Sequence, residues 1–378
     1  MSAPTIGVFL DPPSENWRAM DLCGEMLIRE WRAMPGEVSP TPLGIDLPRL
    51  ARRSRLPRSV GLNIDRVAGR FATYPAYAAR QRRRFDYFHV VDHSYAQIVH
   101  VLPHARTGVF CHDLDAFRST LDPERAPRPP WFRAMQSIML RGLTAAAVVF
   151  YTTNVVREEI ECAEIVPPSR LVHAPLGVSP GLDAVVRDDA DARELLAPLE
   201  GRPYLFHVGS AMPRKRLDVL FETFARLRPR FPDLRLVQNG AVLDAEQRAH
   251  LARCGIEEAL FQPPGPVNRE VLGALYRRAA AVLVTSDSEG FGMPVIEALA
   301  CGSVVFASDI PVLREVGGGA VVHCRVGDPT DWATTLQAFL DGSLEVPSLD
   351  RRLAQAAKYT WKRHARAILD AYRALEVE

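Results

Sequence analysis

Residues 280–302 of the chain read AAVLVTSDSEGFGMPVIEALACG. The opening part, residues 280–286, is a short and almost continuously apolar run, which indicates a buried strand. A tight loop with Gly290 and Gly292 follows, and Pro294 suits the first turn of a helix that begins beside it. The stretch therefore predicts a strand, a glycine-rich loop and a helix, which together form the repeating unit of doubly wound α/β sheets.

The same alternation of apolar runs and helical patterns fills both halves of the chain. Apolar runs that lack two-fold alternation predict parallel strands covered on both faces. The predicted strands span residues 5–10, 88–91, 107–112 and 146–151 in the first half, and 204–209, 234–240, 259–265, 280–286, 303–308 and 320–324 in the second. The predicted helices span residues 20–34, 216–229, 244–254, 269–279, 294–301 and 329–340. This order predicts two Rossmann-like doubly wound domains that face a central cleft.

The boundary between these domains is expected in the Pro- and Gly-rich segment 174–203. We expect an N-terminal domain over 1–178, a C-terminal domain over 179–358, and an amphipathic helix within 359–378 that packs back on the first domain. Residues 40–60 are rich in Pro and Arg and are interpreted as an irregular excursion. Ligands of doubly wound sheets bind at the carboxyl ends of the strands, so functional residues are sought directly after each strand.

Composition restricts the class of protein. A length of 378 residues suits two domains with separate cores, and a net charge of +1 gives the whole chain no polyelectrolyte character. The cysteines form no CxxC or CxxH spacing, so we expect reduced, buried thiols in a cytosolic enzyme. They lie at positions 23, 111, 162, 254, 301 and 324. The first residues do not resemble a signal peptide, and no run of 18 apolar residues predicts a membrane span, so the expected location is cytoplasmic.

Charge is nevertheless uneven along the chain. Between Arg49 and Arg84 there are eleven arginines and one acidic residue, Asp65. Three interpretations stay open: an ordinary solvated surface, peripheral contact with the anionic inner face of a membrane, or an anionic acceptor. Nucleic acid is not expected as a partner, because the run matches no recognition module.

Two cations and two acids lie directly after predicted strands of the second half. Arg214 and Lys215 stand where a helix begins, and free N–H groups at a helix start together with these cations favour a diphosphate. Glu289 is expected at the cleft mouth, where it would accept from sugar hydroxyls. Glu297 is expected in the first helical turn, where it would reach the hydroxyls of a ribose. The intervening backbone N–H groups of residues 291–293 and of Val295 are expected to meet phosphate or sugar oxygens.

Residues 289–320, EGFGMPVIEALACGSVVFASDIPVLREVGGGA, resemble the donor-binding signature of the retaining GT-B-fold glycosyltransferases of family 4, the glycosyl transferases group 1 type. HVGSAMPRKRLDVL at 207–220 is similar to the phosphate-binding loop of that family, and GPVNREVLGALYRRA at 265–279 is similar to the segment that frames the base. The resemblance covers residues 204–325 and is diffuse over the N-terminal half. It implies a metal-independent hexosyltransferase without a cofactor, which uses a UDP-, GDP- or dTDP-sugar as donor.

The resemblance also implies roles for individual residues. Glu289 would contact the donor sugar, Glu297 the ribose, and Lys215 with Arg214 the departing diphosphate. Val267 would contact the base. The loop residues Gly290, Phe291, Gly292 and Met293 would line the sugar and the phosphates. In GVFCHDLDAF, residues 108–117, the matching histidine of the reaction centre is His112. The implied catalytic set is His112, Lys215 and Glu289.

The chain departs from the family pattern in two loops. DPPSENWRAM at 11–20 has no glycine, so Asn16, Trp17 and Arg18, with Asp113 from HDLD, are expected to shape the acceptor side. Some relatives carry an arginine where this chain has Ser210, which places more weight on Arg214 and Lys215. The sequence DLD matches a DxD metal motif, but we expect no metal, because a cationic loop neutralises the phosphates in a GT-B enzyme.

The predicted function is transfer of a hexose-type sugar, with retention, to a hydroxyl of a saccharide or lipid-linked saccharide in polysaccharide or glycoconjugate synthesis. Two alternatives keep the fold: a GT-B nucleotide-sugar epimerase, and a non-catalytic nucleotide-sugar binding protein. A nicotinamide dehydrogenase is not expected, since no GxGxxG follows either first strand.

Overall fold

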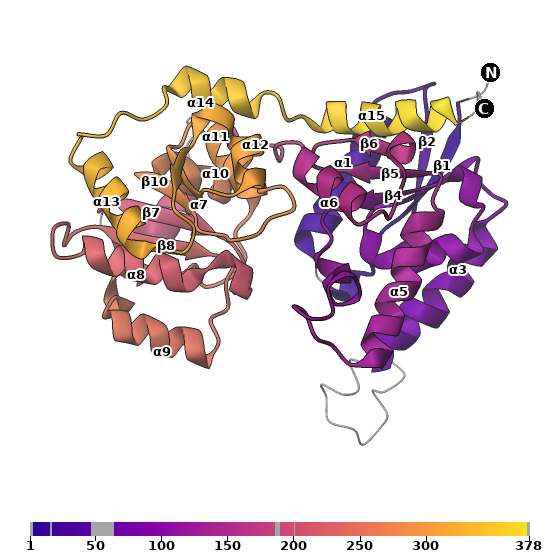
Figure 1. The fold of residues 1–378 in the computed structure, drawn as a ribbon. Coiled ribbons are helices and arrows are strands. Elements are labelled where there is room, and N and C mark those ends of the chain that lie inside the picture. The colour runs from indigo at the N-terminus through magenta and orange to yellow at the C-terminus, as the bar shows by residue number, and fades with distance from the viewer. Residues whose placement is uncertain (1–2, 16, 47–63, 186–189, 200, 376–378) are drawn as a thin grey trace. The chain divides into compact units, whose positions relative to one another are not determined.

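The structure of the chain is a computed structural model that describes residues 3–15, 17–46, 64–185, 190–199 and 201–375. The chain divides into two compact units (Figure 1). The first unit comprises Met1–Leu176 and Trp361–Glu378, and the second comprises Gly177–Thr360. The divisions lie within two residues of the boundaries expected at 178 and 358, and the C-terminal helix belongs to the first unit.

The first unit contains a six-stranded parallel sheet in the order β2-β1-β3-β4-β5-β6. Its strands are β1 Thr5–Phe9, β2 Ser39–Leu43, β3 Tyr87–Val90, β4 Thr107–Cys111, β5 Val148–Tyr151 and β6 Leu171–His173. Its α-helices are α1 Arg18–Arg32, α3 Tyr74–Gln81, α4 Arg118–Leu121, α5 Pro130–Ala145, α6 Asn154–Cys162 and α15 Trp361–Ala374, and a 3₁₀ helix, η4, spans His93–Val101.

Strand β2 corrects the interpretation of residues 40–60 as wholly irregular. It pairs in parallel with β1, from Thr5 opposite Ser39 to Phe9 opposite Leu43. Pro40 and Pro42 lack an N–H group, and that loss is tolerated at the edge of a sheet. The two prolines are therefore the reason why the sequence pattern did not predict this edge strand.

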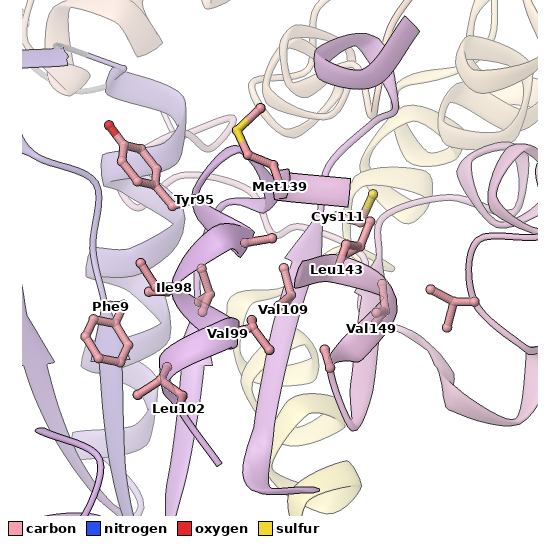
Figure 2. Packing of buried hydrophobic residues seen from close by; sticks show 14 of the residues in the cluster. Phe9, Tyr95, Ile98, Val99, Leu102, Val109, Cys111, Met139, Leu143 and Val149 are labelled. Atoms are coloured by element: carbon pink, nitrogen blue, oxygen red, sulfur yellow. The ribbon is translucent and has the colours of Figure 1, made fainter. Parts of the chain in front are cut away.

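The main core of the first unit lies between the sheet and the helices η4 and α5. Ile98 and Val99 of η4, and Leu102 directly after it, gather over β1 and β4, beside Met139 and Leu143 of α5 (Figure 2). All five side chains are buried, and those of Ile98, Val99 and Leu143 are completely removed from water, which supplies hydrophobic stabilisation of the unit. This packing holds the carboxyl ends of β1, β3 and β4 in place along one edge of the sheet.

The C-terminal helix α15 packs within the first unit. Trp31 of α1 donates its indole N–H to the carbonyl of Ala365 over 2.9 Å. Glu37 forms an ion pair with Arg366, with 2.5 Å between Oε2 and Nη1, and a second pair with Arg373. Hydrogen bonds from Arg366 lower the pKa of Glu37 to about 2. The last helix is thus an integral part of the unit formed by the first 176 residues.

The second unit contains a parallel sheet in the order β12-β11-β10-β7-β8-β9. Its strands are β7 Tyr204–Val208, β8 Arg235–Asn239, β9 Leu260–Phe261, β10 Ala281–Val284, β11 Val305–Ser308 and β12 Val322–Cys324. Its helices are α7 Ala190–Leu196, α8 Leu217–Leu227, α9 Ala245–Cys254, α10 Arg269–Arg278, α11 Met293–Ala300, α12 Pro311–Gly317, α13 Pro329–Leu340 and α14 Leu349–Ala356. Because β7 and β10 are neighbours, the loops that follow them meet at one edge.

Within the described residues, the six cysteines form no disulfide bond, and four of them are buried; Cys162 is exposed, contrary to the expectation of uniformly buried thiols. Among the described residues, no helix is both long enough and apolar enough to cross a membrane.

Candidate functional site

Two loops of the second unit are tied together at the carboxyl ends of β7 and β10. The N–H of Asp287 donates to the carbonyl of Arg214 over 3.0 Å, and the hydroxyl of Thr285 donates to the carbonyl of Lys215 over 2.8 Å. Arg214 also donates through Nη1 to the carbonyl of Ser288 over 3.0 Å. The glycine-rich loop and the cationic loop therefore form one structural element, although about 70 residues separate them in the sequence.

The carboxylate of Glu289 lies against both cations. Its Oε1 is 2.5 Å from Nζ of Lys215, and its Oε2 is 2.9 Å from Nη1 of Arg214. Ser286 donates a further hydrogen bond to Oε1 over 2.7 Å. The side chain of Glu289 is only 6% exposed, and its carboxylate faces the two cations; its expected place at a cleft mouth stays a prediction. It is turned inward because two cations compensate for its burial.

These partners decide the charge state of Glu289. Burial alone would raise its pKa, but the charges of Lys215 and Arg214 and the hydrogen bonds outweigh that effect and hold the pKa below the ordinary value. The carboxylate is thus ionised at neutral pH. The cluster of Arg214, Lys215 and Glu289 carries a net positive charge, which suits an anion.

The start of α8 is shaped by Arg216. This residue has φ of 49° and ψ of 53°, in the left-handed region that non-glycine residues rarely adopt. Its guanidinium pairs with Asp218 over 2.8 Å and lies 3.8 Å from the carboxylate of Asp287. Arg216, the third cation of this loop, therefore interacts with the acidic residues Asp218 and Asp287. Arg214 and Lys215 precede it in a short 3₁₀ turn, Pro213–Lys215.

The glycine-rich loop leads directly into α11. Gly292 has φ of 88°, a conformation that glycine adopts without strain, and a Cβ there would lie 2.7 Å from a methyl of Leu313. Met293 begins the helix, as the sequence predicted. The N–H of Val295 donates to the carbonyl of Gly292 over 2.9 Å, so this expected ligand donor is already engaged. Phe291 is buried, and its ring meets that of Tyr359 edge-on.

Glu297 lies in the second turn of α11 and not in the first turn, where the sequence analysis placed it. It is 7% exposed. The hydroxyl of Ser179 donates to its Oε1 over 2.8 Å, and the hydroxyl of Tyr276 donates to its Oε2 over 3.1 Å. Burial raises the pKa of Glu297, and the two hydroxyl donors oppose that rise.

The remaining predicted residues of the second unit border these loops. Val267 is half-buried and lies two residues before α10, whose first turn is capped by Asn268. Ser210 is exposed next to Gly209, the residue that follows β7. The structure thus brings Arg214, Lys215 and Glu289 into direct contact, while Val267 stands at the start of a neighbouring helix.

In the first unit, His112 follows β4 and is buried. Its Nε2 lies 2.8 Å from the carbonyl oxygen of Val91, so Nε2 carries the proton and donates. Its backbone N–H donates to Nδ1 of His93 over 3.2 Å. Burial lowers the pKa of His112, although Asp92 opposes the shift. The imidazole of His112 is therefore neutral at pH 7, with its donor nitrogen already used.

The acids of HDLD have separate partners. Asp113 accepts the N–H of Asp115 over 3.0 Å, and its Oδ1 lies 3.8 Å from Nε2 of His93. Asp115 instead pairs with Arg118 over 2.8 Å. Within the described ranges, no group of three or more His, Cys, Asp or Glu side chains is placed to hold a metal ion.

The loop after β1 contributes one exposed aromatic residue. Trp17 precedes α1 with its side chain about half exposed. Asn16 lies outside the described residues, and Arg18 begins α1 without a described side chain. Glu15 is buried, with 2.8 Å between its Oε2 and Nη2 of Arg66.

Several polar residues at these strand ends were not identified from the sequence. Asp11 follows β1 and Asp92 follows β3, and both carboxyls are buried. Burial and the charge of Asp92 raise the pKa of Asp11 well above its usual value. Ser179 and Tyr276 were missed as partners of Glu297, because 118 and 21 residues separate them from it. Asp11 and Asp92 directly follow the predicted strands 5–10 and 88–91, and that position was the available signal for both.

The comparisons with known proteins agree with this geometry. Residues 188–360 match the family described as "Glycosyl transferases group 1". The chain is 29% identical to O-antigen chain mannosyltransferase B of Escherichia coli over 72% of each protein. It is 34% identical to a D-inositol 3-phosphate glycosyltransferase of Frankia alni over 52% of each, so it spans about half the length of that relative.

Two solved structures are similar over nearly the whole chain. Sucrose-phosphate synthase from Thermosynechococcus elongatus superposes with a TM-score of 0.71 at 18% identity, covering 99% of both chains. Anabaena HepE in complex with UDP and glucose superposes with a TM-score of 0.73 at 15% identity, covering 98% of this chain and 100% of the other.

The two six-stranded parallel sheets and this similarity define a GT-B fold, built from two Rossmann-like domains. Within that fold class, residues 188–360 match the group 1 glycosyltransferases, the family that the motifs of residues 204–325 resemble.

Proposed function

We propose that the chain moves a hexose-type sugar from a nucleoside diphosphate sugar to a hydroxyl of a saccharide or lipid-linked saccharide, with retention of configuration. The observation that carries the proposal is the cluster of Lys215, Arg214 and Glu289, which joins two loops at the carboxyl ends of neighbouring strands. Ligands of doubly wound sheets bind at that edge. The mannosyltransferase relative and the neighbour that holds UDP and glucose support the same substrate classes.

In this proposal, Lys215 and Arg214 bind the diphosphate. Glu289 stays beside them, and its oxygens accept hydrogen bonds from the sugar. The N–H groups of Phe291 and Met293, at the entrance of α11, meet the phosphates, and Gly290 and Gly292 leave room for the ligand. Because the cluster already carries net positive charge, the phosphate charge needs no bound metal for neutralisation.

The rest of the donor lies along the neighbouring helices. Glu297, buried on α11, accepts from the ribose, and Val267, before α10, contacts the base. The base and the sugar would then lie on opposite sides of the diphosphate.

The chemical step follows from where charge develops. The bond between the anomeric carbon and the phosphate oxygen breaks, and the bond to the acceptor oxygen forms on the same face of the sugar. The acceptor proton passes to the leaving phosphate, so no protein base is required. Negative charge grows on the phosphate, and the preorganised cations stabilise it. His112 and the acceptor-side residues Asn16, Trp17, Arg18 and Asp113 contribute from the first unit.

Direct assay of transfer tests the proposal. Purified protein is incubated with UDP-, GDP- and dTDP-hexoses, with and without saccharide acceptors, and products are followed by mass spectrometry and by NMR of the anomeric proton. Retention of configuration in a new glycoside supports the proposal. Epimerised or hydrolysed donor without an acceptor, or inversion at the anomeric carbon, contradicts it. Undiminished transfer in the presence of EDTA supports a metal-independent reaction.

Attachment to the inner face of a membrane is a separate part of the proposal. Much of the segment between Arg49 and Arg84 lies outside the described residues. Within the described part, Arg66 and Arg70 face the carboxylate of Glu15, whereas the arginines at 80 and 82–84 are exposed near the end of α3. Sedimentation with anionic vesicles that is lost at high salt supports attachment; equal recovery with neutral vesicles contradicts it.

A further inference from the structure

Each oxygen of the Glu297 carboxylate accepts a hydrogen bond from a buried hydroxyl. Ser179 and Tyr276 are 4% and 0% exposed, and each donates to a different oxygen. The two donors come from distant parts of the unit: Ser179 lies near the point where the chain enters it, and Tyr276 lies on α10. This arrangement fixes the plane of the carboxylate and leaves no freedom for its last torsion angle.

Both donors are themselves held in place. The ring of Tyr276 packs edge-on against Phe206 of β7, with 5.2 Å between ring centroids. Next to Ser179, the N–H of Val178 donates to the carbonyl of Tyr359 over 3.1 Å. The hydroxyls are therefore preorganised and do not require a ligand to order them.

The carboxylate of Glu297 can accept only a limited number of further hydrogen bonds. An ionised carboxylate offers about four acceptor positions, two on each oxygen. One position on each oxygen is taken by a hydroxyl of the protein. One position on each oxygen is left, a pair that matches the two vicinal hydroxyls of a ribose. A 2′-deoxyribose has one hydroxyl fewer and would leave a buried acceptor unpaired, which is costly.

We propose that Ser179 and Tyr276 are positioning residues that orient Glu297 toward both ribose hydroxyls, so that the donor is a ribonucleoside diphosphate sugar and not a dTDP-sugar. The inference rests on the proposed function and narrows its substrate class.

The test compares binding of ribose and deoxyribose forms by calorimetry. UDP, GDP and ADP are titrated first, and the tightest of them is then compared with its own 2′-deoxy form. Wild-type protein is expected to prefer the ribose form by about tenfold or more, the effect of one hydrogen bond to a charged group. In Tyr276→Phe and Ser179→Ala, this preference is expected to fall at least about threefold.

Two matched controls keep the carboxylate contacts intact. Tyr204→Phe removes a buried hydroxyl that donates to the carbonyl of Leu275, next to Tyr276. Ser303→Ala removes the hydroxyl that donates to the carbonyl of Tyr276. Both controls are expected to keep the ribose preference, even where they lower the thermal midpoint, because neither touches Glu297.

The pH profile separates positioning from mere stability. In a variant that lacks one of the hydroxyl donors, the pKa of Glu297 is higher than in wild type. As the pH falls, nucleotide binding by the variants is therefore expected to weaken at a higher pH than binding by wild type. Equal affinity of wild type for ribose and deoxyribose forms overturns the ribonucleoside assignment. An unchanged preference in both variants overturns the positioning role. Absence of binding to every nucleotide overturns the proposed function itself.

Discussion

Nζ of Lys215 lies 2.5 Å from Oε1 of Glu289, across 74 positions of the sequence. This contact places a carboxylate beside the cations that the proposed sugar transfer needs for its leaving diphosphate. Arg214 shares the same carboxylate, so two cations face one anion and one positive charge remains uncompensated. The diphosphate of a donor would bind at this excess positive charge, and Glu289 would hold both cations in position until the donor arrives.

Loss of Lys215 tests the phosphate assignment. Lys215→Ala is expected to lower the rate of transfer at least about 100-fold, or about 3 kcal/mol, because one preorganised contact to the leaving phosphate is lost. Arg214 still pairs with Glu289, so the fold should persist in circular dichroism. Lys362→Ala, an exposed change on α15, serves as the control for loss of one lysine. Turnover within a factor of about two of wild type would remove Lys215 from the site.

Replacement of Glu289 and of Glu297 is expected to weaken nucleotide binding to different extents. Glu297→Ala should weaken binding of the bare nucleoside diphosphate by about tenfold or more, because hydrogen bonds from ribose to a charged group are lost. Glu289→Ala should weaken it less, since that side chain faces the sugar and its loss frees Lys215 and Arg214 for phosphate. Isothermal titration of both variants gives the order. The opposite order would exchange the two roles.

Asp11 is expected to make stability depend on pH. Its pKa is raised by burial and by Asp92, so its contribution is fully present below the ordinary pKa of 3.8 and is lost as pH rises through the folded-state value. Asp11→Asn mimics the protonated acid. It should therefore raise the urea midpoint by an amount that grows as the pH rises above 3.8 towards the folded-state pKa of Asp11. The exposed control Asp233→Asn should give no such trend. A shift of the urea midpoint in Asp11→Asn that stays the same at every pH would contradict the shared burial of Asp11 and Asp92.

Tyr372 is expected to anchor α15 in the first unit. Its hydroxyl donates to the carbonyl of Phe88 over 2.9 Å and lies 3.0 Å from Nδ1 of His89, all in a buried setting. Tyr372→Phe leaves both groups unpaired, which should cost roughly 1–3 kcal/mol of unfolding free energy. Urea denaturation measures the loss. The half-buried Tyr77→Phe should cost less, and equal losses would argue against a specific anchoring role.

The edge strand β2 shows one limit of prediction from sequence. Pro40 and Pro42 predict irregular backbone, because proline cannot donate to a sheet. Only the position of the strand at the sheet edge, beside β1, makes them acceptable. That position depends on how the whole sheet is ordered, which no local pattern encodes.

The sequence by itself determined the fold class and the positions at which functional residues occur. Apolar runs and helical periodicity are local properties, and parallel strands place their loops at one edge, so Glu289, Glu297 and Lys215 could be named from the chain alone. The tertiary structure decided what these residues do to one another. It turned Glu289 inward onto two cations and enclosed Glu297 between Ser179 and Tyr276. Burial and pairing depend on contacts across distant parts of the chain, and they set the charge state of each carboxylate.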